Sequence, residues 1–195
     1  TLTTSSNGLM GKSVERYEFQ SQWVINAAGL EAHGLAAKIA GLGPSSVPKV
    51  HLCKGDYFTY SKPSPFSRLV YPVPEANTAG LGIHGTLDMG NQLRFGPDTE
   101  YIDSVHYDIA EAKRDKFAKA IQGYFPQVTP EMLNPAYAGI RPKLAGPGEP
   151  AKDFLIQTKE DHGIEGLIQL FGIESPGLTA SLAIGNHVLK VLKNQ

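Results

Sequence analysis

Gly166-Leu-Ile-Gln-Leu-Phe-Gly172, continued by Ile173-Glu-Ser-Pro-Gly-Leu-Thr179, is the stretch that decides the fold. The first part is short, apolar and bounded by glycines, so it predicts a buried strand. Ser175-Pro176 predicts a helix start, because a hydroxyl can cap the first N–H groups and proline loses nothing there. A helix with apolar spacing follows over 178–192. Such a strand, loop and helix start would present free N–H groups and a positive dipole end to an anion.

The same pattern also fits an ordinary buried strand–helix pair, so the rest of the chain has to decide between the two. The chain has 195 residues, 41% of them hydrophobic, and a formal net charge of −1. This composition is that of a globular protein with one large or two small domains, and it favours neither a nucleic-acid surface nor an anionic membrane surface. No stretch approaches the ~18 apolar residues of an integral membrane segment.

Cysteine usage and the first residue add two expectations. Cys53 is the only cysteine, which excludes a disulfide framework and a cysteine-based metal site and predicts a small core residue. The chain begins with Thr1 and shows no signal peptide. We therefore expect a cytoplasmic protein from which an upstream segment has been removed.

The first fifty residues predict a surface meander and half of a βαβ unit. Residues 1–20 are polar, with a turn signal at Asn7-Gly8. Residues 22–27 form a compact apolar strand that leads through Ala28-Gly29 into a helix over 31–42.

Residues 47–103 change in style and predict an antiparallel sheet. Short β-rich runs alternate with Pro, Gly and Asn turns. Residues 88–91 are typical of a hairpin tip. The expected strands cover residues 47–53, 57–60, 68–73, 81–87 and 92–95.

The last predicted elements are one clear helix and two short strands. An apolar stripe predicts a helix over 108–125, with Asp108 and Glu111 resembling a capping box. Strands are expected over 137–143 and 153–158, and a turn at 161–163.

Gly80-Leu-Gly-Ile-His-Gly85 matches the dinucleotide fingerprint G-x-G-x-x-G, but a hairpin and not a helix follows it, so we reject the match. In a strand, His84 would lie on the polar face among glycines that leave room for a ligand. An imidazole there suits a general base, and a hydrogen-bonded structural histidine is the alternative. The other five histidines show no spacing for a metal site and are expected to be structural; they are His33, His51, His106, His162 and His187.

Arg141 is the second candidate. Pro142 forces the residue before it into an extended conformation, so Arg141 should project from a strand. Its planar fork suits a carboxylate, and an ordinary surface arginine is the alternative.

Seven motifs then occur in a familiar order, and together they resemble the FAD-dependent D-amino-acid oxidase superfamily, in its L-2-hydroxyglutarate dehydrogenase branch. The resemblance is to the C-terminal half and runs from about Gln22 to the end. The motifs are Asn26-Ala-Ala-Gly-Leu30, Lys54-Gly-Asp-Tyr-Phe58, Pro65-Phe-Ser-Arg-Leu-Val-Tyr-Pro-Val-Pro74, Gly80-Leu-Gly-Ile-His-Gly-Thr-Leu-Asp88, Arg94-Phe-Gly-Pro97, Tyr137-Ala-Gly-Ile-Arg-Pro-Lys143 and Gly172-Ile-Glu-Ser-Pro-Gly-Leu-Thr179.

The resemblance implies an α+β fold, in which a curved antiparallel substrate-domain sheet with helices joins the C-terminal part of a Rossmann-type FAD domain. Residues 1–50 would be a partial FAD-binding domain and 51–136 the substrate domain. Residues 137–195 would return to the FAD domain with the flavin-contacting loop and the C-terminal helix.

The resemblance also implies roles for the candidate residues. Arg141 would clamp a substrate carboxylate, and His84 would accept the hydroxyl proton as hydride leaves for the flavin. Lys54 and Tyr57 would help to bind the substrate or the ring. The helix near Pro176 would aim its dipole at the ring's pyrimidine edge. The implied cofactor contacts are Ala28, Gly29, Gly172, Ile173, Glu174, Ser175, Pro176, Gly177, Leu178 and Thr179.

The family's Gly-rich βαβ unit for the FAD pyrophosphate is absent from these 195 residues. We therefore expect the chain to need an N-terminal half of the FAD domain. Without that half, the chain should be inactive and should not retain FAD. It should also expose apolar surface where parallel strands would pair. The expected activity is oxidation of a small L-2-hydroxy acid, and family membership permits attachment to a membrane surface. A D-amino-acid or glycine oxidase and a non-catalytic β-rich binding domain are the alternatives.

Overall fold

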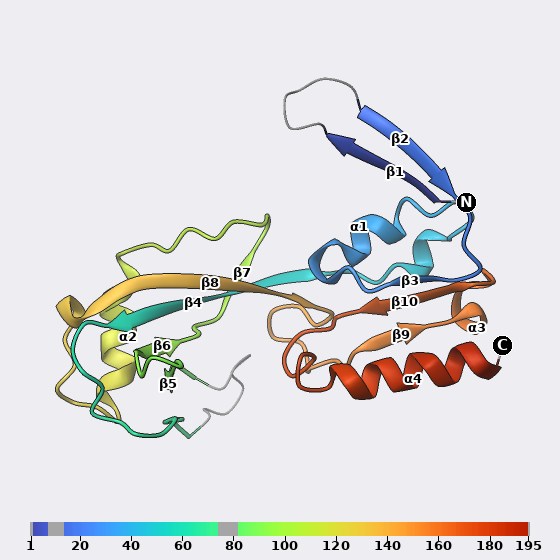
Figure 1. Cartoon of the computed structure of the whole chain (residues 1–195). Helices are drawn as coiled ribbons and strands as arrows, with labels where there is room; N and C mark the ends of the chain where they lie inside the picture. The colour runs from blue at the N-terminus through green and yellow to red at the C-terminus, as the bar shows by residue number, and fades with distance from the viewer. Residues whose placement is uncertain (1, 8–13, 74–81, 195) are drawn as a thin grey trace.

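The computed structural model describes residues 2–7, 14–73 and 82–194. Figure 1 shows an elongated molecule in which two long strands, β4 (His51–Tyr60) and β8 (Leu133–Lys143), run between two bodies. One body contains a five-stranded sheet and the other a three-stranded sheet. A separate hairpin consists of β1 (Leu2–Asn7) and β2 (Val14–Phe19). The fold is therefore a mixed α+β fold with antiparallel sheets, as the sequence predicts.

The five-stranded sheet is antiparallel and centred on β4. Its other strands are β5 (His84–Leu87), β6 (Leu93–Gly96), β7 (Glu100–Ile102) and β8. β8 pairs along the whole of β4, with Gly55 opposite Gly139 and Cys53 opposite Arg141. The hairpin tip at 88–91 is confirmed, because the N–H of Asn91 donates to the Asp88 carbonyl and Asn91 has a φ of 60°.

The core of this body lies between the sheet and helix α2 (Lys113–Gln122). Phe117 of α2 is fully buried and packs on Phe58 of β4, with ring centroids 4.6 Å apart. Leu93 and Ile121 are also buried in this cluster. Burying aromatic and aliphatic side chains together is the main stabilising term for such a body. Because Phe58 points toward α2, the residues that alternate with it along β4 point away from α2.

The three-stranded sheet has the order β3-β10-β9, where β3 is Val24–Asn26, β10 is Leu167–Phe171 and β9 is Leu155–Gln157. β10 runs parallel to β3 and antiparallel to β9. All five residues of β10 are buried, which confirms the predicted strand.

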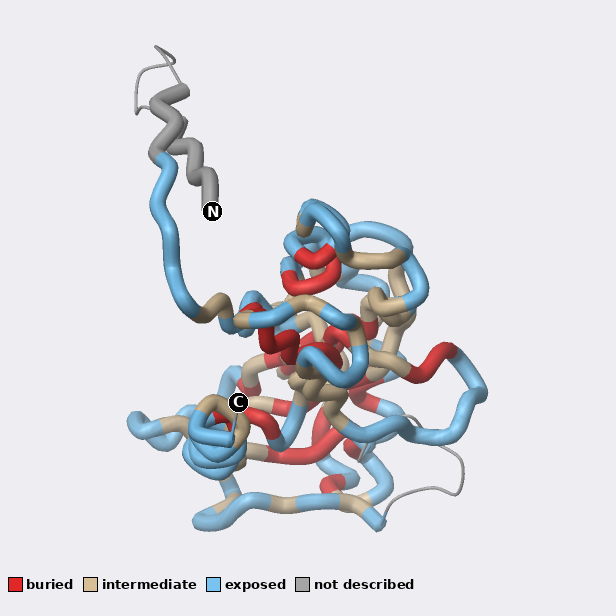
Figure 2. The backbone as a smooth tube through the Cα atoms, turned by 90° about the vertical axis from the view of Figure 1, so that its right-hand side faces the viewer, coloured by how far each residue is buried: buried red, intermediate tan, exposed pale blue. Residues whose placement is uncertain are grey.

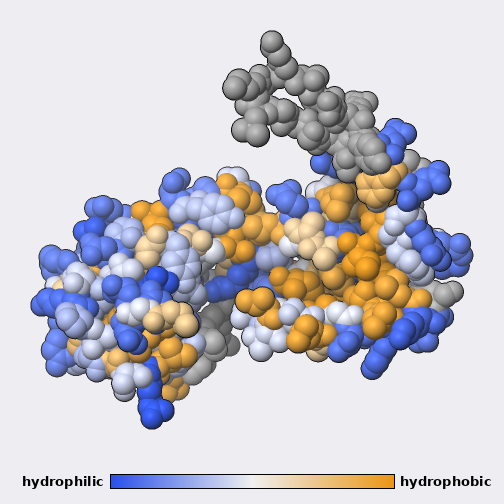
Figure 3. Space-filling model, in the orientation of Figure 1, coloured by the Kyte–Doolittle hydropathy of each residue, from blue (hydrophilic) through white to orange (hydrophobic). Residues whose placement is uncertain are grey.

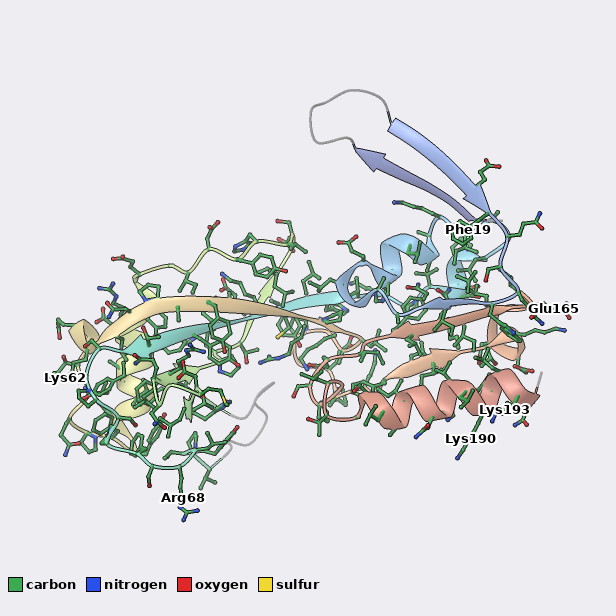
Figure 4. The ribbon with its side chains drawn as sticks, viewed as in Figure 1. Phe19, Lys62, Arg68, Glu165, Lys190 and Lys193 are labelled. Carbon is green, nitrogen blue, oxygen red and sulfur yellow. The ribbon has the colours of Figure 1, made fainter. Side chains whose placement is uncertain are left out.

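Alternation along β10 explains how two helices cover its two faces. Phe171 packs against α1 (Ala32–Ala36), while Ile168 and Leu170 pack against α4 (Ser181–Asn194). Figure 2 shows buried backbone in the middle of the molecule and a largely exposed α4. Figure 4 shows Lys190 and Lys193 pointing away from the sheet, as expected for an amphipathic helix.

Several predicted element bounds are wrong. The C-terminal helix begins at Ser181 and not near Pro176, because residues 175–180 form turns. The helix predicted over 108–125 covers only α2, its N-cap is Ala112, and no side chain caps it. The helix predicted over 31–42 shortens to α1 after a 3-10 turn at Gly29–Glu31, and two further 3-10 turns cover Pro44–Ser46 and Pro130–Met132.

The remaining differences concern short segments. The strand predicted over 68–73 makes only an isolated bridge between Val70 and Gly85. The turn predicted at 161–163 overlaps the end of a one-turn helix, α3 (Lys159–His162), which has a capping box formed by Thr158 and Asp161. The Asn7-Gly8 turn signal extends outside the described residues.

A buried ion network lies on the α2 side of β4. Lys54 and Asp56 are buried, with Lys54 Nζ 3.2 Å from Asp56 Oδ1. Lys113 of α2 bonds the other oxygen of Asp56 and lies 3.2 Å from Asp98 and 2.6 Å from Glu100. The N–H of Asp56 donates to Asp98 at 2.9 Å. Lys116 also lies 3.2 Å from Asp98, so three ammonium groups face three carboxylates and the network carries no formal net charge.

We expect Asp98→Asn to lower the free energy of unfolding by about 3 kcal/mol, since it removes one partner from a buried pair. Burial alone would raise the pKa of Asp98, but the Asp56 N–H and the Lys113 ammonium outweigh it, and the pKa is lowered from 3.8. A lowered pKa means that this stability is complete above pH 3.8 and is lost as the pH falls through the folded value.

Denaturant unfolding at pH 7 and at acid pH measures both effects, with the exposed Asp103→Asn as the control. Equal stabilities of the Asp98 and Asp103 variants at pH 7 would contradict the role given to the network.

Candidate functional site

A cavity of about 750 Å³ lies where the β4–β8 ribbon meets the loop after β10. Figure 3 shows hydrophilic side chains at the junction between the two bodies. Segments far apart in the sequence form the walls of this cavity, so the sequence alone could only suggest that they meet. The lining residues are Tyr57, Tyr71, His84, Pro97, Thr99, Arg141, Lys143, Ala151, Lys152, Asp153, Phe154, Glu174, Ser175 and Pro176.

Arg141 reaches this cavity from β8. Its Nη1 lies 3.7 Å from the sulfur of Cys53, directly opposite on β4. Within the part of the chain that the structure describes, Arg141 makes no ion pair with a carboxylate. By contrast, Lys143 lies 2.8 Å from Glu174, and Lys152 is also paired with a glutamate. The guanidinium is therefore available for an anionic ligand, and its fork suits a carboxylate.

His84 begins β5 and is largely buried. Its Nδ1 lies 3.1 Å from the carbonyl oxygen of Gly82, and its ring stacks on Tyr71 with centroids 4.2 Å apart and planes 16° apart. A carbonyl oxygen only accepts, so Nδ1 carries the proton of the neutral ring and Nε2 keeps its lone pair. Stacking and this hydrogen bond together fix the plane of the imidazole.

The electrostatics keep His84 neutral near pH 7. Burial lowers the pKa of His84 from 6.5, the Arg141 charge lowers it further, and the hydrogen bond to Gly82 raises it less than these two lower it. A neutral imidazole with a free Nε2 can accept a proton. The cavity therefore combines a cation for an anionic group with a base for an acidic proton.

Tyr57 of β4 is the third predicted residue at the cavity. Its ring stacks on Tyr137 of β8, with centroids 4.4 Å apart and planes 13° apart. Burial raises the pKa of Tyr57 above 10, and the neighbouring Tyr137 adds to the increase. Tyr57 is therefore a protonated, flat wall of the cavity.

Lys54 does not reach the cavity. It alternates with Cys53 and Tyr57 along β4, so it points to the opposite face. Its side chain is 2% exposed, and its ammonium contacts Asp56 and donates to the carbonyl oxygen of Asp108. Lys54 therefore belongs to the buried ion network and does not contact a ligand in the cavity, contrary to the prediction.

The loop after β10 supplies another wall. Gly172 has a φ of 68°, and a Cβ on it would lie 2.7 Å from Leu144, so only glycine fits there. Glu174, Ser175 and Pro176 line the cavity. Close contact also explains why residue 177 is a glycine, because a Cβ there would lie 2.6 Å from the carbonyl oxygen of Glu174.

Some lining residues carry sequence signals too weak to single out. Tyr71 lies in the motif over 65–74, but no local pattern gives it a role, because its stacking on His84 depends on the tertiary fold. Lys143 is two residues after Arg141 on the same strand, so strand periodicity could have placed it on the same face. Pro97 and Thr99 flank Asp98, which the ion network holds.

The remaining histidines lie outside the cavity. His33 is buried beside Phe171, and burial lowers its pKa. Among the described residues, no group of three or more His, Cys, Asp or Glu side chains could hold a metal ion.

Comparison with known proteins now identifies the family. The family model described as FAD dependent oxidoreductase matches residues 5–190. The chain belongs to the FAD-dependent oxidoreductase family. FAD is therefore the cofactor of its family, as the sequence motifs predict.

Individual members of the FAD-dependent oxidoreductase family resemble the chain over part of their length. The mitochondrial L-2-hydroxyglutarate dehydrogenase of Arabidopsis thaliana is 45% identical over 177 residues, which cover 85% of this chain and 36% of the plant protein. The human mitochondrial L-2-hydroxyglutarate dehydrogenase is 22% identical over 215 residues, covering 91% of this chain and 46% of that protein. The chain thus spans less than half of either relative.

A solved structure shows the same fold. The dithionite-reduced L-alpha-glycerophosphate oxidase of Mycoplasma pneumoniae, with FAD bound, superposes with a TM-score of 0.67 at 20% identity. The match covers 87% of this chain and 42% of that chain.

The loop wall fits one edge of the family's cofactor. The backbone N–H groups of Ser175, Leu178 and Thr179 have no hydrogen-bond partner among the described residues. These donors precede the positive end of α4, so they suit the carbonyl-bearing edge of a flavin ring, which gains negative charge on reduction. Ala28 and Gly29 follow β3 beyond this cavity, and Gly29 lines a second, apolar groove.

In the described part of the chain, no helix has the length and hydrophobicity needed to cross a membrane.

Proposed function

We propose that the intact protein is an FAD-dependent dehydrogenase of a small L-2-hydroxy acid, with L-2-hydroxyglutarate as the first candidate. The observation that carries the proposal is the pairing of an unneutralised Arg141 with a neutral His84 on the walls of one cavity. The names of the plant and human relatives support the substrate.

The proposed chemistry divides the substrate between these two residues. Arg141 binds the substrate carboxylate through its fork, which places the adjoining hydroxyl-bearing carbon in the cavity. Nε2 of His84 accepts the hydroxyl proton, so the alcohol becomes the carbonyl of a 2-oxo acid. FAD, when bound, supplies the acceptor for the hydride that leaves this carbon. Tyr57 contributes a flat wall beside the substrate.

Residues 28–29 and 172–179 form the proposed cofactor contacts of this chain. In the second group, Ser175, Leu178 and Thr179 offer their free N–H groups to the ring edge. We also propose that 51–136 is the substrate domain and that 1–50 and 137–195 belong to a Rossmann-type FAD domain. The parallel pairing of β3 with β10, and the helices on both faces of this sheet, support that division.

Anaerobic mixing of the FAD-bound protein with a panel of substrates tests the activity. We expect L-2-hydroxyglutarate to bleach the oxidised flavin faster than D-2-hydroxyglutarate, glycine, D-alanine or glycerol 3-phosphate. Faster bleaching by an amino acid would assign the protein to the amino-acid oxidases. Bleaching by none of them would leave a binding domain as the better description.

An apolar groove of about 520 Å³ is a surface that another part of the intact protein could cover. It lies between β3, β10 and α4, and Figure 3 shows apolar side chains gathered over this body. Ile25 on edge strand β3 is 43% exposed and Leu189 on α4 is 46% exposed. We propose that the N-terminal half of the FAD domain covers this groove, because apolar surface of this extent favours burial.

Leu189→Glu tests this cover. In the FAD-bound protein we expect the variant to release FAD at lower denaturant concentration than wild type, because a charge would be buried at the contact. The matched control is Lys190→Glu, which points away from the sheet (Figure 4). Equal FAD retention in the two variants would show that the groove faces solvent.

A further inference from the structure

Gly139 is a glycine that the fold itself does not require. It lies inside β8, where glycine weakens a strand because it loses more backbone entropy than other residues. Its φ lies outside the left-handed region, and a Cβ built on it would meet no atom within 4 Å. Neither strain nor crowding therefore explains this residue.

Its partner across the ribbon shows the opposite situation. A Cβ on Gly55 would lie 2.6 Å from Cβ of Pro97 and 3.4 Å from Nη2 of Arg141. The guanidinium and the Pro97 ring thus fill the space over Gly55. The space over Gly139, directly opposite, stays open.

The open space lies on the face of the ribbon that carries Arg141, and Gly139 is exposed there. Gly139 lies two residues from both Tyr137 and Arg141 along β8, so its open side is the side that carries both of these side chains. It is also two residues from the only cation that we assign to the substrate carboxylate.

We propose that Gly139 is a specificity-determining residue, and that the space over it takes the part of the substrate next to the carboxylate held by Arg141. This inference rests on the proposed function. It deepens that function because it assigns the room for a substituent on the hydroxyl-bearing carbon. A site with this room accepts a five-carbon dicarboxylate, and filling it should favour shorter 2-hydroxy acids.

Gly139→Ala and Gly139→Val in the FAD-bound protein test this inference. One extra methyl or methylene in a filled pocket changes discrimination by about tenfold or more. We therefore expect about a tenfold loss in kcat/KM for L-2-hydroxyglutarate with Ala, a larger loss with Val, and a smaller loss for L-lactate in both. Calorimetric titration with glutarate, which has no hydroxyl to oxidise, should show the same order of affinity loss.

The control is Gly34→Ala in α1, where the new Cβ would lie 3.8 Å from Glu31 in ordinary contact. The midpoint of unfolding should not fall in the Gly139→Ala variant, since no atom has to move. Unchanged glutarate affinity and unchanged substrate preference in both Gly139 variants would overturn the inference. If wild type itself neither binds glutarate nor oxidises any 2-hydroxy acid, the proposed function fails instead.

Discussion

Replacing Arg141 by Met should raise KM for L-2-hydroxyglutarate by about 100-fold, with a smaller effect on kcat. Two charge-assisted hydrogen bonds to the carboxylate are lost. Because hydrogen bonds to water replace part of their energy, the net loss of binding free energy is about 3 kcal/mol. The structure supports so large an effect because no described carboxylate neutralises Arg141. Steady-state kinetics and glutarate titration of the FAD-bound protein measure it.

Arg68→Met is the matched control, because Arg68 points away from the molecule in Figure 4. It removes the same charge from the surface and should leave KM within about twofold of wild type, since exposed charges interact weakly through water. Similar increases in KM for both variants would mean that Arg141 acts only through the general charge of the protein. Arg141→Lys separates charge from geometry, because an ammonium keeps the charge but not the planar fork.

Replacing His84 by Gln should slow flavin reduction at saturating substrate by about 100-fold or more, as expected for loss of a general base. Substrate binding should change little, since the carboxylate contact at Arg141 remains. Rapid mixing under anaerobic conditions measures the rate, and His106→Gln serves as the control because His106 is exposed and outside the cavity. Reduction of the His84 variant at the wild-type rate would show that another group accepts the proton.

The pH dependence gives an independent check on His84. Its pKa is lowered from 6.5 by burial and by Arg141, so the base stays neutral and active at pH 6.5. The rate should therefore fall to half its maximum at a pH below 6.5, as the imidazole gains a proton. This acid limb should disappear in the Gln variant, because Gln does not titrate.

Local patterns predicted those parts of the fold that local interactions control. The apolar run before Gly172 and the turn at 88–91 are correct, because burial and turn geometry are encoded within a few residues. The start of the last helix is wrong: Ser175-Pro176 has the composition of an N-cap, but the chain makes turns up to Ser181 while Gly177 packs against Glu174. A local turn, in which the N–H of Gly177 donates to the carbonyl oxygen of Glu174, takes the place of the predicted helix start.

The site shows the same division between local and tertiary information. Pro142 and strand alternation were enough to place Arg141 on an extended segment, and the polar face of β5 was enough to select His84. Lys54 shows the limit, because the sequence does not say which face of β4 meets the ligand. That choice depends on α2, whose Lys113 neutralises Asp56 on the Lys54 side.

Tyr71 could not be found from sequence for a related reason. It belongs to a segment that makes one isolated bridge, and its position over His84 follows from that bridge between Val70 and Gly85. Such contacts join residues that no periodicity connects. They set the plane of the imidazole, on which the proposed proton transfer depends.

A crystal structure of the FAD-bound protein with glutarate tests the central claim most directly. The account predicts that one glutarate carboxylate lies on the Arg141 fork, that Nε2 of His84 faces the neighbouring carbon, and that residues 173–179 contact the edge of the flavin ring. A ring bound against another face of the chain, with Arg141 and His84 both away from the glutarate, would contradict it.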